Sequence, residues 1–193
     1  MVRYMIETIM QPSTSDIRSL AKEVISLCIR NNIILTTAES CTGGMISMAI
    51  TDIPGSSSAF ERGYITYSNR SKIECLGVQE SLIQNFGSVS SEVAVAMAEG
   101  ALLNSNSTLS LAVTGIAGPK GGTTEKPVGL VYIASSKAKG RTTHKEYIFI
   151  KPKDVKDLNE SKNSDGSSFL VRDYIRNTTT IKGLELLLSI LKS

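Results

Sequence analysis

The sequence predicts an α/β fold in which one mixed β-sheet lies between layers of α-helices. Short apolar runs alternate with amphipathic stretches along much of the chain, and no internal repeat is visible. A length of 193 residues is enough for one such domain with a substantial core, and the apolar fraction of 41% is ordinary for a globular protein. We therefore expect a single domain over residues 13–193, preceded by an N-terminal extension over residues 1–12.

The first half of the chain is expected to start with an amphipathic helix over residues 13–31, whose apolar stripe includes Ile17, Val24 and Cys28. An apolar run at residues 33–35 predicts a buried strand, and the pair Gly43–Gly44 predicts a tight turn before the next helix. The further elements of this half are, in order, a helix at 45–51, a loop at 54–58, a strand at 63–68, and helices at 71–76, 81–85 and 91–103.

The second half is expected to contain three strands and a closing helix. Residues 109–113 predict a buried strand that runs into a glycine-rich loop at 114–122. Two neighbouring strands follow at 128–135 and 143–150, and a long helix follows at 170–191. The polar stretch between them, residues 151–168, is rich in Ser, Asn, Asp and Lys and predicts a mobile surface loop.

Composition argues against several classes of protein. The net charge of +3 is too small to indicate a nucleic-acid-binding protein. No run of about 18 apolar residues predicts a membrane-spanning helix, and the first residues lack the pattern of a signal peptide. We therefore expect a cytoplasmic protein that binds neither membrane nor nucleic acid.

The cysteines and the histidine exclude further kinds of site. The three cysteines are odd in number and show no CxxC spacing, which argues against a disulfide framework and a zinc site. No metal or other cofactor is predicted. The single histidine, His144, falls in a strand-like stretch, so a Ser-His-Asp mechanism is not favoured.

The chemistry suggested most directly by the sequence lies at residues 36–44, Thr-Thr-Ala-Glu-Ser-Cys-Thr-Gly-Gly. Ser40 is predicted to lie where a strand ends and a helix begins. Unpaired backbone N–H groups and the positive end of a helix dipole suit acyl transfer or anion binding at such a point. The alternative is that Ser40 and Thr42 only cap the helix.

Other motif matches are weaker. The loop at 114–122 does not fit a P-loop or a GxGxxG fingerprint. Its glycines are compatible with an anion-binding nest, and equally with a flexible crossover. Two SxxK matches, at Ser19 and Ser136, lie on an amphipathic helix and near a charged strand end, and we interpret both as chance.

Five groups of residues occur in the order seen in one family. They lie at residues 38–44, 52–57, 67–78, 113–119 and 125–129. On these motifs the chain resembles the C-terminal domain of the competence/damage-inducible protein CinA, whose stand-alone members are nicotinamide-nucleotide amidases. The resemblance covers almost the whole chain and implies a three-layer α/β sandwich.

The resemblance also implies a reaction. The carboxamide of nicotinamide mononucleotide would be hydrolysed to nicotinic acid mononucleotide and ammonia by a serine, a tyrosine and a lysine, which fall on Ser40, Tyr67 and Lys72. Ser40 would attack the carboxamide carbon, and Lys72, directly or through Tyr67, would take its proton. Such a role requires a lysine whose pKa lies well below the free value of about 10.4.

Substrate-binding residues follow from the same resemblance. Backbone N–H groups of Thr42, Gly43 and Gly44 would hold the oxyanion. The family pattern also places a threonine and an arginine in the site, here Thr114, with Gly115, and Arg172. The usual Gly-Asp before that arginine is replaced by the insertion at 151–168, so the match to Arg172 depends on its Arg-x-x-x-Arg spacing.

Alternatives remain for each catalytic residue and for the function. Tyr67 could be a packed strand residue and Lys72 a solvated one, and Glu39 either orients the turn or pairs with Lys72. The chain could instead be a catalytically silent nucleotide-binding or assembly module, or an amidase for a related pyridine nucleotide. Apolar helix faces and the habit of the family favour a homodimer or a larger homo-oligomer.

Overall fold

The computed structural model describes residues 14–150 and 167–193 and contains one five-stranded sheet with the strand order β2-β1-β3-β4-β5. The strands are β1 (Leu35–Glu39), β2 (Phe60–Ile65), β3 (Leu109–Gly115), β4 (Leu130–Lys137) and β5 (Thr142–Ile148). The helices are α2 (Thr14–Arg30), α3 (Met45–Thr51), α4 (Asn69–Leu76), α5 (Glu80–Phe86), α6 (Ser91–Leu103) and α8 (Ser167–Leu191), with a 3-10 turn η1 (Ser56–Ser58). The predicted α/β fold is confirmed. The predicted extension at 1–12, and residues 151–166 of the predicted loop, lie outside the described residues.

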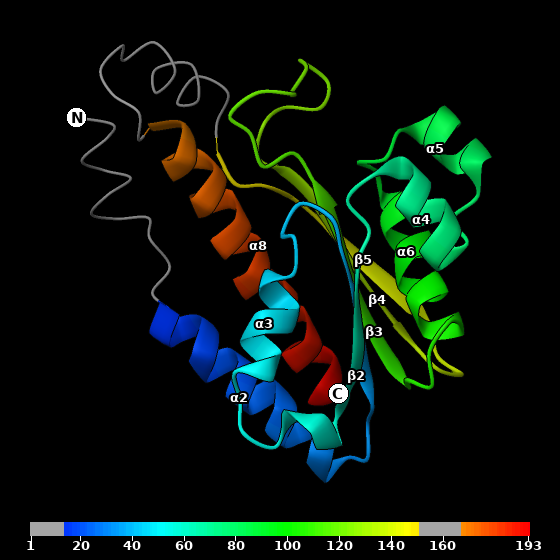
Figure 1. Ribbon diagram of the computed structural model, residues 1–193, viewed down its shortest axis with the longest axis vertical. Coiled ribbons are helices and arrows are strands. Elements are labelled where there is room, and N and C mark those ends of the chain that lie inside the picture. Colours follow the sequence, from blue (N-terminus) through cyan, green and yellow to red (C-terminus); the bar gives the residue numbers. More distant parts are fainter. Residues whose placement is uncertain (1–13, 151–166) are drawn as a thin grey trace.

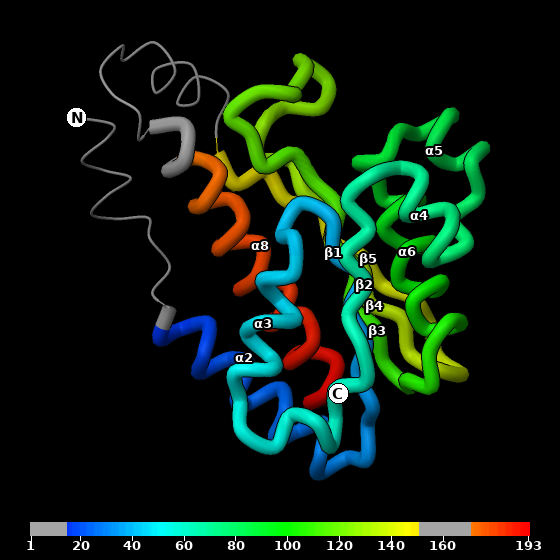
Figure 2. The backbone as a smooth tube through the Cα atoms, viewed as in Figure 1, coloured from blue at the N-terminus to red at the C-terminus, as the bar shows by residue number. Residues whose placement is uncertain are grey.

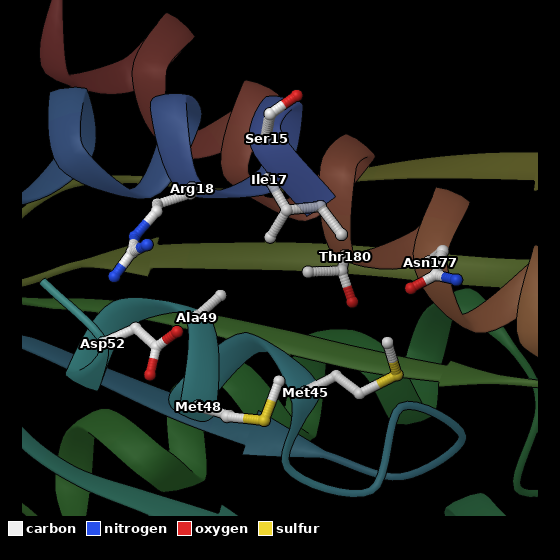
Figure 3. A pocket seen from close by; sticks show the side chains of 9 residues that line it. All are labelled: Ser15, Ile17, Arg18, Met45, Met48, Ala49, Asp52, Asn177 and Thr180. Atoms are coloured by element: carbon white, nitrogen blue, oxygen red, sulfur yellow. The ribbon is translucent and has the colours of Figure 1, made fainter. Parts of the chain in front are cut away.

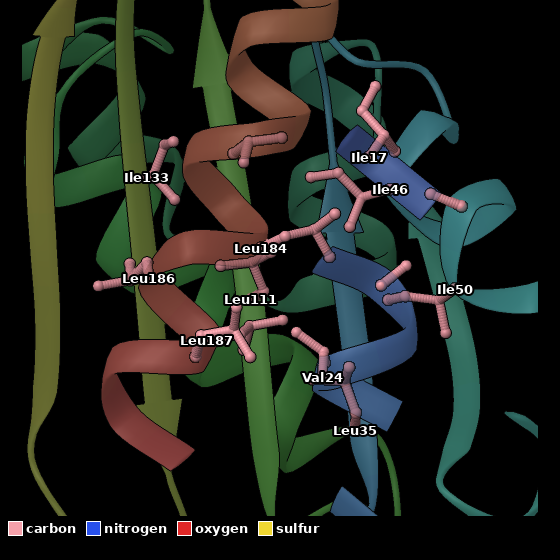
Figure 4. Close-up of a cluster of buried hydrophobic side chains, with 14 of the residues drawn as sticks. Ile17, Val24, Leu35, Ile46, Ile50, Leu111, Ile133, Leu184, Leu186 and Leu187 are labelled. Atoms are coloured by element: carbon pink, nitrogen blue, oxygen red, sulfur yellow. The ribbon is translucent and has the colours of Figure 1, made fainter. Parts of the chain in front are cut away.

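Helices cover both faces of the sheet (Figures 1 and 2). Helices α2, α3 and α8 lie on one face, and α4, α5 and α6 lie on the other. The larger core cluster packs the first group of helices against the sheet and includes Ile46, Leu111 and Leu184 (Figure 4). A smaller cluster packs α6 against the other face through residues such as Met97 and Ala112. These two apolar layers hold the sheet rigidly between the helices.

Strand β1 begins where the predicted strand ends, so the prediction of residues 33–35 was displaced. All five residues of β1 are buried, because the strand is central and is covered on both faces. The burial could not be predicted from the sequence because two of the five residues are threonines, and polar residues are mostly exposed. The Thr36 hydroxyl donates to the carbonyl of Arg62 at 2.9 Å, and the Thr37 and Ser47 hydroxyls share a 2.8 Å hydrogen bond. Paired in this way, both hydroxyls are compatible with a buried strand.

The other boundaries differ less. Helices α3 and α6 match their predicted ranges, and the predicted pair at 128–135 and 143–150 is confirmed as the antiparallel strands β4 and β5, shifted by one or two residues. Strand β2 begins three residues before its predicted start. The prediction missed this start because β2 is an edge strand whose exposed polar residues give no apolar pattern. Helix α8 begins at Ser167, so the loop predicted through residue 168 was too long at that end.

The strand directions locate a point where a site is expected. β1 pairs in parallel with β2 through Glu39 and Ile65, and in parallel with β3 through Glu39 and Val113. The carboxyl ends of these three strands therefore lie at the same edge of the sheet. The connection from β1 to β2 contains α3, and that from β2 to β3 contains α4–α6 on the opposite face. Ligands in open α/β sheets bind beyond the carboxyl ends of the strands, at the point where successive connections pass to opposite faces of the sheet.

Candidate active site

Ser40 is the first residue after β1, at this edge of the sheet. Its N–H donates to the carbonyl of Val113 at 3.1 Å, and its own carbonyl accepts from the N–H of Gly43 at 3.1 Å. Gly43 and Gly44 have φ values of 60° and 96°, in the left-handed region that favours glycine. The chain therefore turns sharply from β1 into α3, as the sequence predicted, and Ser40 lies at the start of the turn.

Lys72 reaches Ser40 from helix α4, which follows β2 in the chain. Its side chain is only 1% exposed, and its Nζ donates to Ser40 Oγ at 3.1 Å and to the Thr66 carbonyl at 2.8 Å. A capping box between Ser68 and Ser71 fixes the start of α4 and with it the direction of the lysine. Burial lowers the pKa of Lys72 from 10.5 to about 8. A solvated lysine is excluded, and the buried amine lies within hydrogen-bond distance of the Ser40 hydroxyl.

Tyr67 lies beside this pair but does not join it by a direct hydrogen bond. Its side chain is 60% exposed, and its hydroxyl accepts from the Nη2 of Arg172 at 2.7 Å. Within residues 14–150 and 167–193, no direct hydrogen bond links Tyr67 to Ser40 or Lys72. The second guanidinium nitrogen of Arg172 donates to the carbonyl of Gly118 at 3.0 Å. Arg172, at the start of α8, is thus held at the site despite the insertion that precedes it.

A cavity of about 200 Å³ collects most of the predicted site residues. It is lined by Ser40, Cys41, Tyr67, Lys72, Ser88, Val89, Thr114, Gly115, Ala117 and Arg172. Thr114 and Gly115 end strand β3, and the Thr114 hydroxyl donates to the carbonyl of Ser88 at 2.8 Å. Five distant parts of the chain therefore meet around Ser40.

The turn residues Thr42, Gly43 and Gly44 do not line the cavity. The N–H of Gly43 is bonded to Ser40, and the N–H of Gly44 donates to a carboxylate oxygen of Glu39 at 2.9 Å. These two N–H groups are already used inside the protein, which contradicts the prediction that they hold an oxyanion. Of the turn residues next to Ser40, only Cys41 lines the cavity.

Four of the residues at the cavity were not predicted as site residues: Cys41, Ser88, Val89 and Ala117. Ser88 and Val89 lie in the connection between α5 and α6, where no motif marks them. Cys41 is next to Ser40 in sequence, but burial raises the pKa of its thiol to about 12. Because the thiol stays protonated at neutral pH, Cys41 is not a competing nucleophile.

A larger cleft, of about 370 Å³, lies between α2, α3 and α8 (Figure 3). Met45, Met48 and Ile17 give it an apolar lining, with Arg18 and Asp52 at one side. None of Ser40, Lys72 and Arg172 lines it. Size alone therefore does not locate the site, and the smaller cavity at Ser40 carries the reactive groups.

The described residues contain no group of three or more His, Cys, Asp or Glu side chains that could hold a metal ion. None of the described helices is long and apolar enough to cross a membrane. His144 is exposed on β5 and does not line the cavity.

Comparison with known proteins gives the same family in sequence and in structure. Residues 17–162 match the family model of the CinA C-terminal domain. CinA-like proteins of Colwellia psychrerythraea and Geotalea uraniireducens are 50% and 56% identical over 117 residues, which is 61% of this chain and 27% and 28% of those proteins. The chain thus spans less than a third of the length of these curated relatives.

Solved structures match over almost the whole chain. The competence/damage inducible protein CihA of Agrobacterium tumefaciens is 38% identical with a TM-score of 0.79, and the match covers 94% of this chain and 98% of that one. The competence damage-inducible protein A of Klebsiella pneumoniae is 26% identical with a TM-score of 0.76, covering 91% of this chain and 97% of that one. With the fold, the ordered motifs and the family model in agreement, the chain belongs to the CinA C-terminal domain family.

Proposed function

We propose that this protein is a nicotinamide-nucleotide amidase that hydrolyses the carboxamide of nicotinamide mononucleotide to nicotinic acid mononucleotide and ammonia. The observation that carries the proposal is the 3.1 Å hydrogen bond between buried Lys72 and Ser40. A serine hydroxyl becomes a strong nucleophile only when a base takes its proton, and a lysine with a lowered pKa is such a base.

The first half of the reaction forms an acyl-enzyme. Ser40 Oγ attacks the carboxamide carbon while its proton passes to the uncharged amine of Lys72. The tetrahedral oxyanion would be held by the backbone N–H of Cys41, which lines the cavity directly after Ser40. Lys72 then gives the proton to the leaving nitrogen, the C–N bond breaks, and ammonia departs.

The second half restores the enzyme. Water attacks the ester carbon and loses a proton to Lys72, which returns that proton to Ser40 Oγ as the acid leaves. One amide and one water become one acid and one ammonia, so no oxidant, reductant or cofactor is needed.

The charge of the cavity favours an anionic substrate. None of the ten lining residues is an acid, and Arg172 supplies a guanidinium that is always positive. A guanidinium can bind a phosphate through two parallel hydrogen bonds. We assign this role to Arg172, with Tyr67 holding its guanidinium in place through the 2.7 Å hydrogen bond.

The alternative of a catalytically silent module is less well supported. A lysine that is only 1% exposed, with no acidic partner among the described ion pairs, destabilises the folded protein when it is charged. A module that only binds a nucleotide has no use for a base buried against a serine. Retention of this costly arrangement favours an enzyme.

The test is release of ammonia from nicotinamide mononucleotide by the purified protein, with Ser40→Ala and, as a matched control, Ser81→Ala on the exposed surface of α5. We expect activity in the wild type and in Ser81→Ala, and none in Ser40→Ala. Equal rates from wild type and Ser40→Ala would remove Ser40 as nucleophile. Hydrolysis of free nicotinamide but not of the mononucleotide would show that the proposed phosphate-binding role of Arg172 is wrong.

Two further expectations stay predictions: a homo-oligomeric state, which light scattering on the purified protein measures, and a cytoplasmic location, which cell fractionation measures.

A further inference from the structure

Glu39 is a buried carboxylate directly before the proposed nucleophile. It ends strand β1 and is 0% exposed. An uncompensated charge in such a place is strongly unfavourable, so its partners show what the charge does. Among the described ion pairs, none involves Glu39.

Four hydrogen bonds compensate the carboxylate, and all come from the start of helix α3. One oxygen accepts from the N–H groups of Gly44 and Ile46 at 2.9 and 3.1 Å. The other accepts from the N–H and the hydroxyl of Ser47 at 2.8 and 2.6 Å. The orphan N–H groups and the positive dipole end of α3 are thus satisfied by the chain itself. They are not available to a substrate anion.

The same residue also connects the nucleophile to its base through the backbone. The carbonyl of Glu39 accepts from the N–H of Thr66 at 2.8 Å, and the carbonyl of Thr66 accepts from Lys72 Nζ at 2.8 Å. The Glu39 backbone is thus bonded to Thr66 just before Ser40, and the Glu39 carboxylate is bonded to Gly44 just after the turn. Both ends of the turn at residues 40–43 are therefore fixed to Glu39.

We propose that Glu39 is a positioning residue that fixes Ser40 Oγ within reach of Lys72 by closing the turn onto helix α3. This inference rests on the proposed role of Ser40 as a nucleophile. Glu39 does not touch the substrate, because it is not among the residues that line the cavity. A displacement of about 1 Å at a catalytic group is enough to slow a reaction by about 100-fold.

The variant that tests this is Glu39→Gln. An amide nitrogen in place of the first oxygen faces the N–H groups of Gly44 and Ile46 and loses both bonds. In place of the second oxygen it faces the N–H of Ser47 and loses that bond, whereas the Ser47 hydroxyl can turn and accept. The probe is phenylmethylsulfonyl fluoride, which forms a sulfonyl ester with a reactive serine and releases fluoride. The labelling rate is measured by intact mass, and peptide mapping locates the label at Ser40.

We expect Glu39→Gln to be labelled about 10- to 100-fold more slowly than the wild type at a temperature where both are folded. With nicotinamide mononucleotide we expect kcat to fall by a similar factor and KM to stay unchanged. Labelling of folded Glu39→Gln at the wild-type rate would overturn the proposal. So would a wild type that the probe does not label at Ser40.

A second pair of variants covers the case in which Glu39→Gln does not fold. Ser47→Ala removes one of the four hydrogen bonds to Glu39, whereas Thr51→Ala removes a hydroxyl of the same helix that bonds only to helix carbonyls. We expect slower labelling in Ser47→Ala, by about 2- to 5-fold, and no change in Thr51→Ala. Equal rates in the two variants would contradict the role of Glu39.

The probe separates this inference from the proposed function. If the wild type is labelled at Ser40 but releases no ammonia from nicotinamide mononucleotide, the proposed substrate is wrong. Slower labelling of Glu39→Gln in that case still supports the positioning role.

Discussion

The sheet has a parallel half, β2-β1-β3, and an antiparallel half, β3-β4-β5, and the two halves differ in what their strands deliver. The parallel strands end at the same edge, where Ser40 follows β1, Tyr67 follows β2 closely, and Thr114 lies near the end of β3. Strands β4 and β5 supply no side chain to the cavity. Antiparallel neighbours end at opposite edges, so they cannot bring their carboxyl ends together. The residues at the cavity that follow or end a strand therefore come from the parallel half, and the antiparallel half extends the sheet without lining the cavity.

The largest expected effect separates the two halves directly. Ser40→Ala should lower kcat for ammonia release by about 10⁴-fold or more, because loss of a nucleophile removes covalent catalysis. His144→Ala, on exposed β5, should keep the wild-type rate. A comparable loss in His144→Ala would show that the antiparallel half takes part in the reaction and would revive a histidine base.

The next effect concerns the protonation of Lys72, whose pKa burial lowers to about 8. The base must be uncharged, so activity should rise with pH, about tenfold per unit below pH 7, and level off above about pH 8. A pH–rate profile of kcat/KM measures this. Lys72→Met should lose the rise together with most of the activity, and an unchanged profile in Lys72→Met would exclude the lysine as base.

Arg172 is expected to affect binding more than chemistry. Arg172→Gln should raise KM for nicotinamide mononucleotide by about 10- to 100-fold with a smaller change in kcat, because it removes a charge-assisted bond to phosphate. Arg172→Lys should restore only part of the affinity, since an ammonium cannot bind bidentately. If kcat alone falls in Arg172→Gln, the phosphate contact is wrong and Arg172 acts on the reacting groups.

The smallest effect is on stability, and it has the opposite sign to the effect on activity. The pKa of Lys72 is lowered from 10.5 to about 8 in the folded state, so below about pH 8 burial of the charge opposes folding in full, by roughly 3 kcal/mol. That penalty declines as pH rises through 8 to 10.5. After loss of the two lysine hydrogen bonds, Lys72→Met should gain about 1–2 kcal/mol in free energy of unfolding at pH 7.

Urea titrations at pH 7 and pH 10.5 check this difference. The gain from Lys72→Met should shrink or disappear at the higher pH. A Lys72→Met variant that is less stable than the wild type at both pH values would show that the amine is well solvated, and the argument for a buried base would fail.

Much of the fold could be predicted from local pattern. Helices α3 and α6 fall on their predicted ranges because apolar spacing and turn residues decide them locally. Strand β1 was displaced because buried Thr36 and Thr37 resemble exposed residues until their partners are known. The prediction for edge strand β2 was shifted because its polar residues are exposed, and exposed polar residues resemble a loop in the sequence.

The candidate site was predicted in part. Ser40, Lys72 and Arg172 were expected in one site, and they line one cavity. The direct partner of Tyr67 was not foreseen, because Arg172 is 105 residues away in sequence. The N–H groups of Gly43 and Gly44 were expected to be free, since no local signal shows that Glu39 and Ser40 accept from this turn.

The sequence by itself determined the fold class, the family, the sharp turn after Ser40 and the kind of residue available for chemistry, because these depend on local spacing and composition. Only the tertiary structure decided that Lys72 is buried against Ser40 and that Glu39 satisfies the start of α3. A pKa and a hydrogen-bond partner depend on what surrounds a side chain in space, and those surroundings come from strands and helices that are distant in the chain.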